Sequence, residues 1–283
     1  MIQELPKTIY HYCDLNAFIS ILKNRTIWLS NSATTNDSRE NNWINHHIEN
    51  YARFNQPKNE YLDLYNRIIK SYYTNPELPY ISCFSEDGDL LSQWRAYAND
   101  GKGVSIGFNL DTFNHVGIFD NSPTNGDSVI ISKVVYNEEE QFKIVSELFS
   151  YAFELLDKGE EEHAHQVGHS TLKRISMICK NSAFSEEKEI RIIYNPYYMN
   201  LISNIERLKS NDKLKNLPVE FRVKEDKLIT YFKYSFDKTI STKVFESIIL
   251  GPKNMTTQYD IKVLMNTFEI NGIQVIKSKA SYV

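Results

Sequence analysis

Three charged residues lie at the start of an apolar run, Glu187, Glu189 and Arg191. If residues 188–194 form a strand, the alternation of side chains places Glu189 and Arg191 on the same face of a sheet. A charge on a half-buried strand needs a partner or a task, because burying it unpaired is costly. Two interpretations follow. Glu189 and Arg191 are either mutual partners or exposed on an edge strand, or Glu189 is a catalytic carboxylate at the floor of a cleft.

A histidine lies between two tyrosines at positions 10–12, just before a short amphipathic helix that Asp14 is expected to cap. An imidazole at a strand end can hydrogen-bond a ribose or a carbonyl, and a neighbouring ring can stack on a base. His11 and Tyr12 are therefore candidate binding residues.

A third group follows the β-favouring run at residues 80–84, where Ser82 and Ser85 precede a predicted helix that Asp89 can cap. Hydroxyls and main-chain N–H groups converge at such a junction, which suits an anion or a ribose. Trp94 and Tyr97 fit the apolar face of this helix and are expected in the core. Arg95 lies off that face and is expected to meet a phosphate or Glu189.

A polar segment, residues 31–40, contains Asn36, Asp37 and Glu40. Asp37 followed by Glu40 three residues later is typical of a capping box for a helix from about Ser38, although capped loops often border sites. His165 and His169 would share one face of a helix, but no cysteine is near, so we expect a surface position and no metal site.

Composition excludes several classes of protein. The net charge of −4 gives no overall attraction to nucleic acid or to an anionic membrane, and three cysteines without a CxxC pair do not favour a structural zinc site. Neither a P-loop nor a GxGxxG motif is present, which excludes the commonest phosphate-binding motifs. No run reaches the length of a membrane span and the first residues do not resemble a leader, so we expect a cytoplasmic protein that does not contact a membrane.

The pattern of elements predicts an α+β fold without strict βαβ alternation, with a mixed, mainly antiparallel central sheet flanked by helices. We expect a single domain over residues 1–283, with helical insertions at about 38–74 and 137–182. A last helix is predicted from about Thr257 to Phe268. The oligomeric state is not predicted.

In this order, the motifs resemble a bacterial family of unassigned function, DUF2971. The segments that carry the resemblance are residues 10–12, 27–31, 36–40, 83–85, 94–97, 103–108, 187–191 and 248–252. They extend over nearly the whole chain. The family name implies no reaction.

The order of parts is also similar to the ADP-ribosyltransferase fold, whose members carry a His or Arg on the first core strand, a Ser or Tyr on a middle strand and a Glu on a late one. This resemblance implies NAD as a substrate and Glu189 as the catalytic carboxylate, with Glu187 upstream. It also implies that His11 binds a ribose, with Tyr12 beside the ring and Ser82 or Ser85 on the middle strand. The remaining candidates for NAD binding are Asn36, Arg95 and Arg191.

The leading hypothesis is therefore an enzyme that consumes NAD or transfers ADP-ribose to a nucleic acid or protein target, in bacterial stress or phage defence. One alternative is a metal-dependent nuclease that uses Asp37, Glu40, Glu187 and Glu189. Another is a non-catalytic sensor that binds a nucleotide.

Overall fold

The structure is a computed structural model, and it describes residues 4–34, 42–74, 79–113, 127–196, 219–224, 226–235 and 244–282. Asn36, Asp37 and Glu40 lie outside the described residues. The helix expected from about Ser38 is described from Asn45 onward.

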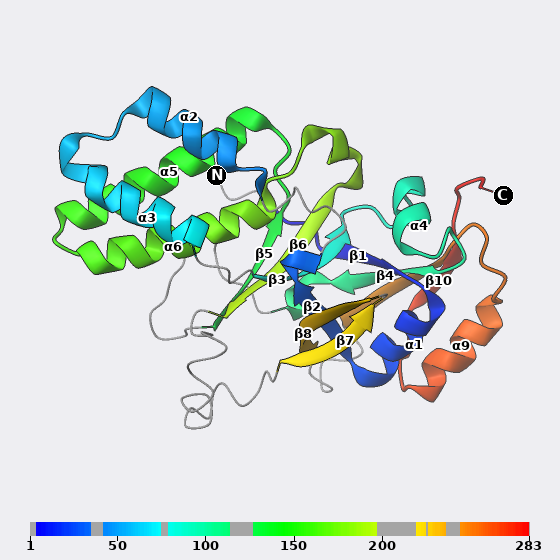
Figure 1. Cartoon of the computed structure of the whole chain (residues 1–283). Coiled ribbons are helices and arrows are strands. Elements are labelled where there is room, and N and C mark those ends of the chain that lie inside the picture. Colours follow the sequence, from blue (N-terminus) through cyan, green and yellow to red (C-terminus); the bar gives the residue numbers. More distant parts are fainter. Residues whose placement is uncertain are drawn as a thin grey trace, which may run out of the picture.

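A mixed sheet of ten strands forms the centre of the described chain (Figure 1), in the order β10-β9-β4-β1-β3-β2-β8-β7, with β6 paired to β3 and β5 to β6. The strands are β1 Thr8–Cys13, β2 Thr26–Asn31, β3 Tyr80–Ser85, β4 Val104–Asn109, β5 Asp127–Lys133, β6 Glu189–Pro196, β7 Glu220–Lys224, β8 Lys227–Ser235, β9 Phe245–Leu250 and β10 Gln274–Lys277. Among these pairings only β9 with β10 is parallel. The predicted α+β class with a mainly antiparallel sheet is confirmed.

The sheet forks at β3. Strand β6 pairs with β3 from Tyr80 to Ser85. The other edge of β3 is shared, because β1 pairs at Ser85 while β2 pairs at Tyr80 and Ile81. Cys83 lies between the two branches.

Helices cover both faces of the sheet. They are α1 Leu15–Asn24, α2 Asn45–Asn55, α3 Leu62–Thr74, α4 Leu91–Tyr97, α5 Glu138–Asp157, α6 Glu161–Ile178 and α9 Gln258–Thr267, with a 3₁₀ segment, η5, at Ser182–Glu187. Helices α1 and α9 pack on the main core, on what we call the α1 face, while α4 packs on the opposite face, the α4 face. None of the helices in the described ranges is long and apolar enough to cross a membrane.

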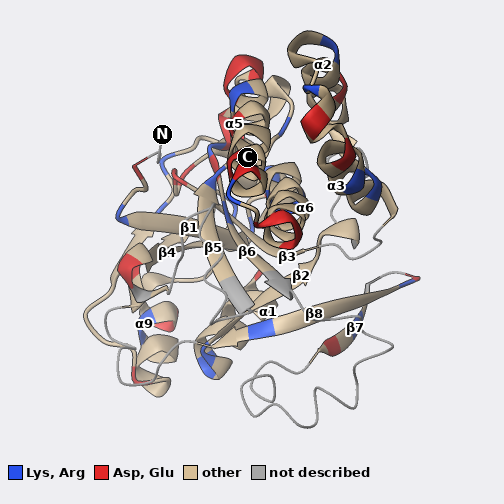
Figure 2. Ribbon diagram, turned by 90° about the vertical axis from the view of Figure 1, so that its left-hand side faces the viewer, with Lys and Arg blue, Asp and Glu red and all other residues tan. Residues whose placement is uncertain are grey.

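The two predicted helical segments pack together. Helices α2, α3, α5 and α6 lie together beside the sheet (Figure 1 and Figure 2) and share a second hydrophobic core with Ile81 of β3 and Ile193 of β6. Strand β6 thus contributes to both cores, because Ile190 and Ile192 point into the core beneath α1. Its buried position explains the continuous apolar run that the sequence shows there.

The predicted capping residue of α1 is confirmed, and the first turn of α9 also carries a side-chain cap. Asp14 caps α1, since its Oδ1 accepts a hydrogen bond of 2.8 Å from the Ala17 N–H. Thr257 and Asp260 form a full capping box for α9. Asp89, however, does not cap α4, because its carboxylate accepts hydrogen bonds from the Trp94 indole N–H and from Ser278 and Lys279 near the carboxyl end.

Candidate functional site

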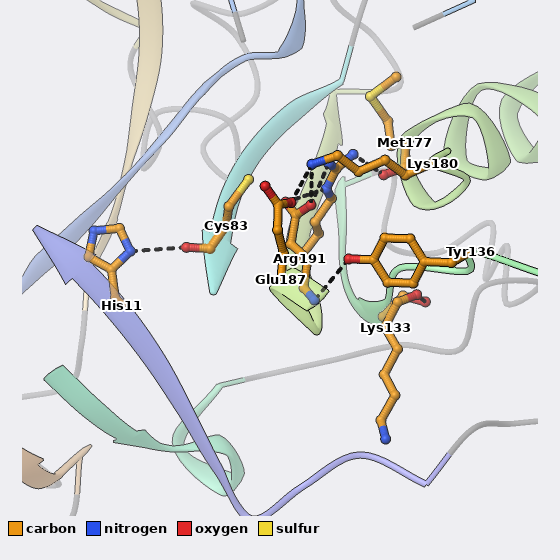
Figure 3. A network of polar contacts seen from close by, with 10 residues as sticks. His11, Cys83, Lys133, Tyr136, Met177, Lys180, Glu187 and Arg191 are labelled. Carbon is orange, nitrogen blue, oxygen red and sulfur yellow. Dashed lines mark hydrogen bonds and ion pairs between the residues drawn. The ribbon is translucent and has the colours of Figure 1, made fainter. Parts of the chain in front are cut away.

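The acidic run and the strand that follows it build a network of ionic contacts on the α4 face of β6 (Figure 3). The Arg191 guanidinium binds Glu189 through two of its nitrogens: Nε donates to Oε1 at 2.7 Å and Nη2 to Oε2 at 2.8 Å. The remaining nitrogen, Nη1, donates to the main-chain oxygen of Met177 at 2.6 Å. The first interpretation of the sequence, mutual partners on one face, therefore describes the pair correctly.

Lys180 is the residue that links the two carboxylates. Its Nζ lies 2.6 Å from Glu187 Oε2 and 3.1 Å from Glu189 Oε2. With two acidic and two basic side chains, the four-residue network, Lys180, Glu187, Glu189 and Arg191, is neutral in sum. It therefore offers little net attraction for a phosphate.

Burial differs across the network. The Glu189 and Arg191 side chains are 7% and 2% exposed, whereas the Glu187 side chain is 14% exposed. Burial alone would raise the pKa of Glu189, but the Arg191 guanidinium and Lys180 outweigh it and lower that pKa to about 2. Glu189 is thus an ionised, fixed anion and not a proton carrier near neutral pH.

Two tyrosines border this network. The Tyr136 hydroxyl accepts a hydrogen bond of 3.1 Å from the Glu189 main-chain N–H (Figure 3). Tyr97 at the end of α4 is 41% exposed, so the prediction of a core position is wrong for it, while Trp94 is fully buried. Burial and the negative charge of Glu187 raise the pKa of Tyr97.

An exposed thiol, that of Cys83, and two exposed rings, those of Tyr97 and Phe184, lie near the network. Cys83 is exposed and shares the α4 face with Arg191, which it opposes in the register. Phe184 of η5 is 38% exposed and lies 4.9 Å from the Lys180 ammonium group. Cys83, Tyr97 and Phe184 are thus accessible side chains near the two carboxylates, and we call these three residues the rim.

His11 lies on the other face of the sheet. Tyr10 pairs with Ser85 and Ser85 with Glu189, so Tyr10 shares the face of Glu189 and the next residue, His11, cannot. The His11 ring packs near Phe84, and its Nδ1 lies 3.0 Å from the Cys83 main-chain oxygen (Figure 3). The expected contact of imidazole and carboxylate is therefore absent: β3 separates them.

The protonation state of His11 follows from these contacts. Because the carbonyl oxygen only accepts, Nδ1 carries the hydrogen and Nε2 is left as an acceptor. Burial lowers the pKa of this histidine, against the opposing effect of the carbonyl. His11 is a neutral ring within the fork between β1 and β2.

The other predicted binding residues have structural partners. Tyr12 is buried, and its hydroxyl donates to the main-chain oxygen of Asp87 and accepts from the Leu90 N–H. Ser85 donates to the Glu187 oxygen, and Ser82 is buried on the α1 face.

Arg95 does not reach Glu189. Its guanidinium lies 4.7 Å from the centre of the Tyr282 ring, so it makes a cation–π contact in place of the expected contact with Glu189. The ring belongs to the carboxyl-terminal segment, which follows the last strand. Because Tyr282 is far from Arg95 in the sequence, the local pattern could not predict this contact.

Among the residues that the structure describes, no group of three or more His, Cys, Asp or Glu side chains is arranged to hold a metal ion. His165 Nε2 lies 2.9 Å from the Ser71 hydroxyl, in a half-buried position at α3. Burial lowers the pKa of His169 to about 4.

Sequence reasoning missed Lys180, Tyr136 and the role of Phe184. Lys180 follows α6 in the chain, and its side chain reaches Glu189, nine residues later, at the start of β6. The only sequence signal was a lone lysine between an apolar helix and an acidic run.

Residues 93–192 match the model of a family described as protein of unknown function, DUF2971. The matched segment contains α4 from Gln93 onward, the rim residues Tyr97 and Phe184, and the four-residue network. The resemblance to this family is therefore confirmed over that segment. No curated protein and no solved structure matches the chain.

Proposed function

We propose that the chain is an enzyme that cleaves the nicotinamide–ribose bond of NAD and passes ADP-ribose to water or to a macromolecular target. One observation carries the proposal. The strands with His11, the serines and Glu189 are consecutive neighbours, β1, β3 and β6, the order in which the ADP-ribosyltransferase fold would need them.

The geometry changes the roles first assigned to the residues. Both oxygens of Glu189 are bound by Arg191, whereas the Glu187 carboxylate is the more exposed of the two. We therefore assign to Glu187 the stabilisation of the positive charge that develops on the ribose as nicotinamide leaves. Glu189 positions Lys180, and Lys180 positions Glu187.

The rim supplies a surface for the planar part of the substrate. The Tyr97 and Phe184 rings and the Cys83 side chain are all accessible, and aromatic rings bind planar ligands by stacking. His11 acts from the other face by holding the Cys83 carbonyl of β3. It is a positioning residue in this scheme.

The proposal also places the protein in the cytoplasm, in bacterial stress or phage defence. All three cysteines are free thiols, which suits a reducing compartment. The setting comes from the family resemblance alone.

The test is nicotinamide release from NAD by the purified protein, alone and with DNA, RNA or a cell extract. We expect Glu187→Gln to lower turnover by about 100-fold or more. The matched control is Glu186→Gln, an exposed neighbour in η5, which should leave turnover unchanged. Full turnover in Glu187→Gln, or none in the wild type with any target, contradicts the proposal.

A second candidate is a module that binds a nucleotide without changing it. It is favoured by the Glu189–Arg191 pair, because both carboxylate oxygens of Glu189 already accept hydrogen bonds from Arg191, as in a structural ion pair. Tight NAD binding without nicotinamide release, unaffected by Glu187→Gln, would support this candidate. The nuclease alternative stays a prediction, and chelator-sensitive cleavage of DNA or RNA would support it.

A further inference from the structure

A second group of residues lies on the α4 face at the other branch of the fork, across β2, β8 and β7. Trp28 of β2 is 37% exposed. Its ring stacks on Tyr231 of β8, with centroids 4.4 Å apart and planes inclined by 30°. The register places Ser30 opposite Tyr231, so both belong to the same surface.

Arg222 of β7 extends across β8 to reach this surface. Its Nη2 donates to Ser30 Oγ at 3.0 Å, and its guanidinium carbon lies 5.3 Å from the centre of the Trp28 ring. Its Nε is buried and has no hydrogen-bond partner. Within the described ranges, no carboxylate lies within ion-pair distance of this guanidinium.

Glu220, two residues before Arg222 on the same strand face, is already engaged. Glu220 accepts a hydrogen bond of 2.8 Å from the Tyr231 hydroxyl and lies 2.7 Å from Lys233 Nζ. Burial lowers the pKa of Arg222, as expected for a cation that no anion compensates. The surface therefore combines one uncompensated guanidinium with one accessible indole.

We propose that Trp28 and Arg222 form a binding site for a nucleotide unit, with the base on the exposed part of the indole and the phosphate on the guanidinium. A guanidinium presents a fork of N–H donors that matches phosphate oxygens. An indole favours a planar ring. The neutral network at Glu187 lacks such an excess of positive charge, so the two sites are chemically distinct.

The probe is adenosine monophosphate, titrated against the full chain by calorimetry and by tryptophan fluorescence. Trp94 is fully buried and Trp43 half-buried, so quenching should come mainly from Trp28. We expect saturable binding, which Arg222→Gln weakens about tenfold or more, the loss of a charge-assisted contact. Adenosine without the phosphate should bind weakly and equally to the wild type and to this variant.

The matched control is Arg95→Gln, because Arg95 also packs on an aromatic ring but on a different surface. It should bind adenosine monophosphate like the wild type. Trp28→Phe, which keeps a ring against Tyr231, should weaken binding in calorimetry if Arg222→Gln does not fold. The proposal is overturned if no saturable binding occurs up to millimolar nucleotide, or if both arginine variants behave alike.

A second arm identifies the source of the unit. A short oligodeoxyadenylate that binds more tightly than the mononucleotide, with a steep salt dependence, supports a single strand of nucleic acid as the ligand. Equal affinity supports a free nucleotide. Neither arm measures turnover of NAD, so failure here leaves the proposed enzymatic site untouched.

Discussion

At the scale of single residues, Glu189 is a structural anion whose charge holds two cations in place. We predict that Glu189→Gln destabilises the protein by about 3–5 kcal/mol, because it removes the carboxylate that binds the buried Arg191 and one of the two carboxylates that bind Lys180. Urea unfolding at neutral pH measures this. The control Glu186→Gln should change stability little, and an equal loss in both variants would contradict the role given to Glu189.

The same residue predicts a pH dependence. The pKa of Glu189 is lowered from about 4.5 to about 2, so its stabilisation is complete above about pH 4.5 and is lost as the pH falls toward 2. The stability gap between wild type and Glu189→Gln should therefore shrink over this range. A gap that stays constant between pH 5 and pH 2.5 would show that Glu189 does not titrate with this pKa.

The three thiols should differ in reactivity. Burial raises the pKa of Cys13 and of Cys179, whereas Cys83 is exposed on the rim. We predict that a thiol reagent modifies one cysteine quickly in the native protein and three after unfolding. Cys83→Ser should abolish the fast phase, and its persistence would mean that another thiol is accessible.

Residue types and alternation were enough to predict the Glu189–Arg191 pair, because both residues lie two apart on one strand. They could not predict the position of His11. Its face depends on the pairing of Tyr10 with Ser85, and a shift of one residue in that register would have placed His11 on the same face as Glu189. Register between distant strands is a tertiary property.

At the scale of elements, helices α3 and α6 approach closely at one small residue. A Cβ added to Gly168 would lie 2.4 Å from Ile68 Cδ1. We predict that Gly168→Ala costs about 1–3 kcal/mol through overpacking. The double variant Gly168→Ala with Ile68→Val should recover part of the loss, and thermal unfolding of the set measures it. Equal losses in single and double variants would contradict the contact.

Strands and helices near well-formed caps were predictable, as α1 and α9 show. Asp89 was not, because the signal for a capping residue says nothing of distant competitors for its carboxylate. Trp94 and Ser278 take Oδ1, and the Lys279 N–H takes Oδ2 at 2.7 Å. Tertiary hydrogen bonds replaced the local one.

At the scale of the whole molecule, β6 joins the two hydrophobic cores. We predict one cooperative unfolding transition, because Ile192 and Ile193 belong to different cores yet are consecutive in the chain. Phe149→Ala in the helical layer should cost about 3–5 kcal/mol and shift circular dichroism and tryptophan fluorescence together. Two separate transitions would mean that the helical layer unfolds as a domain of its own.

The fork at β3 has a consequence for motion. Strands β1, β4, β9 and β10 attach at one end of β3, and β2, β8 and β7 attach at the other. Each set keeps its own ladder of hydrogen bonds, but residues of both sets, among them Ile9 and Phe232, pack into one core on the α1 face, so side-chain packing holds the angle between the sets. A ligand on the α4 face that touched both sets would reinforce that packing, and the His11–Cys83 hydrogen bond, which lies where the sets diverge, is the contact in which to look for a change.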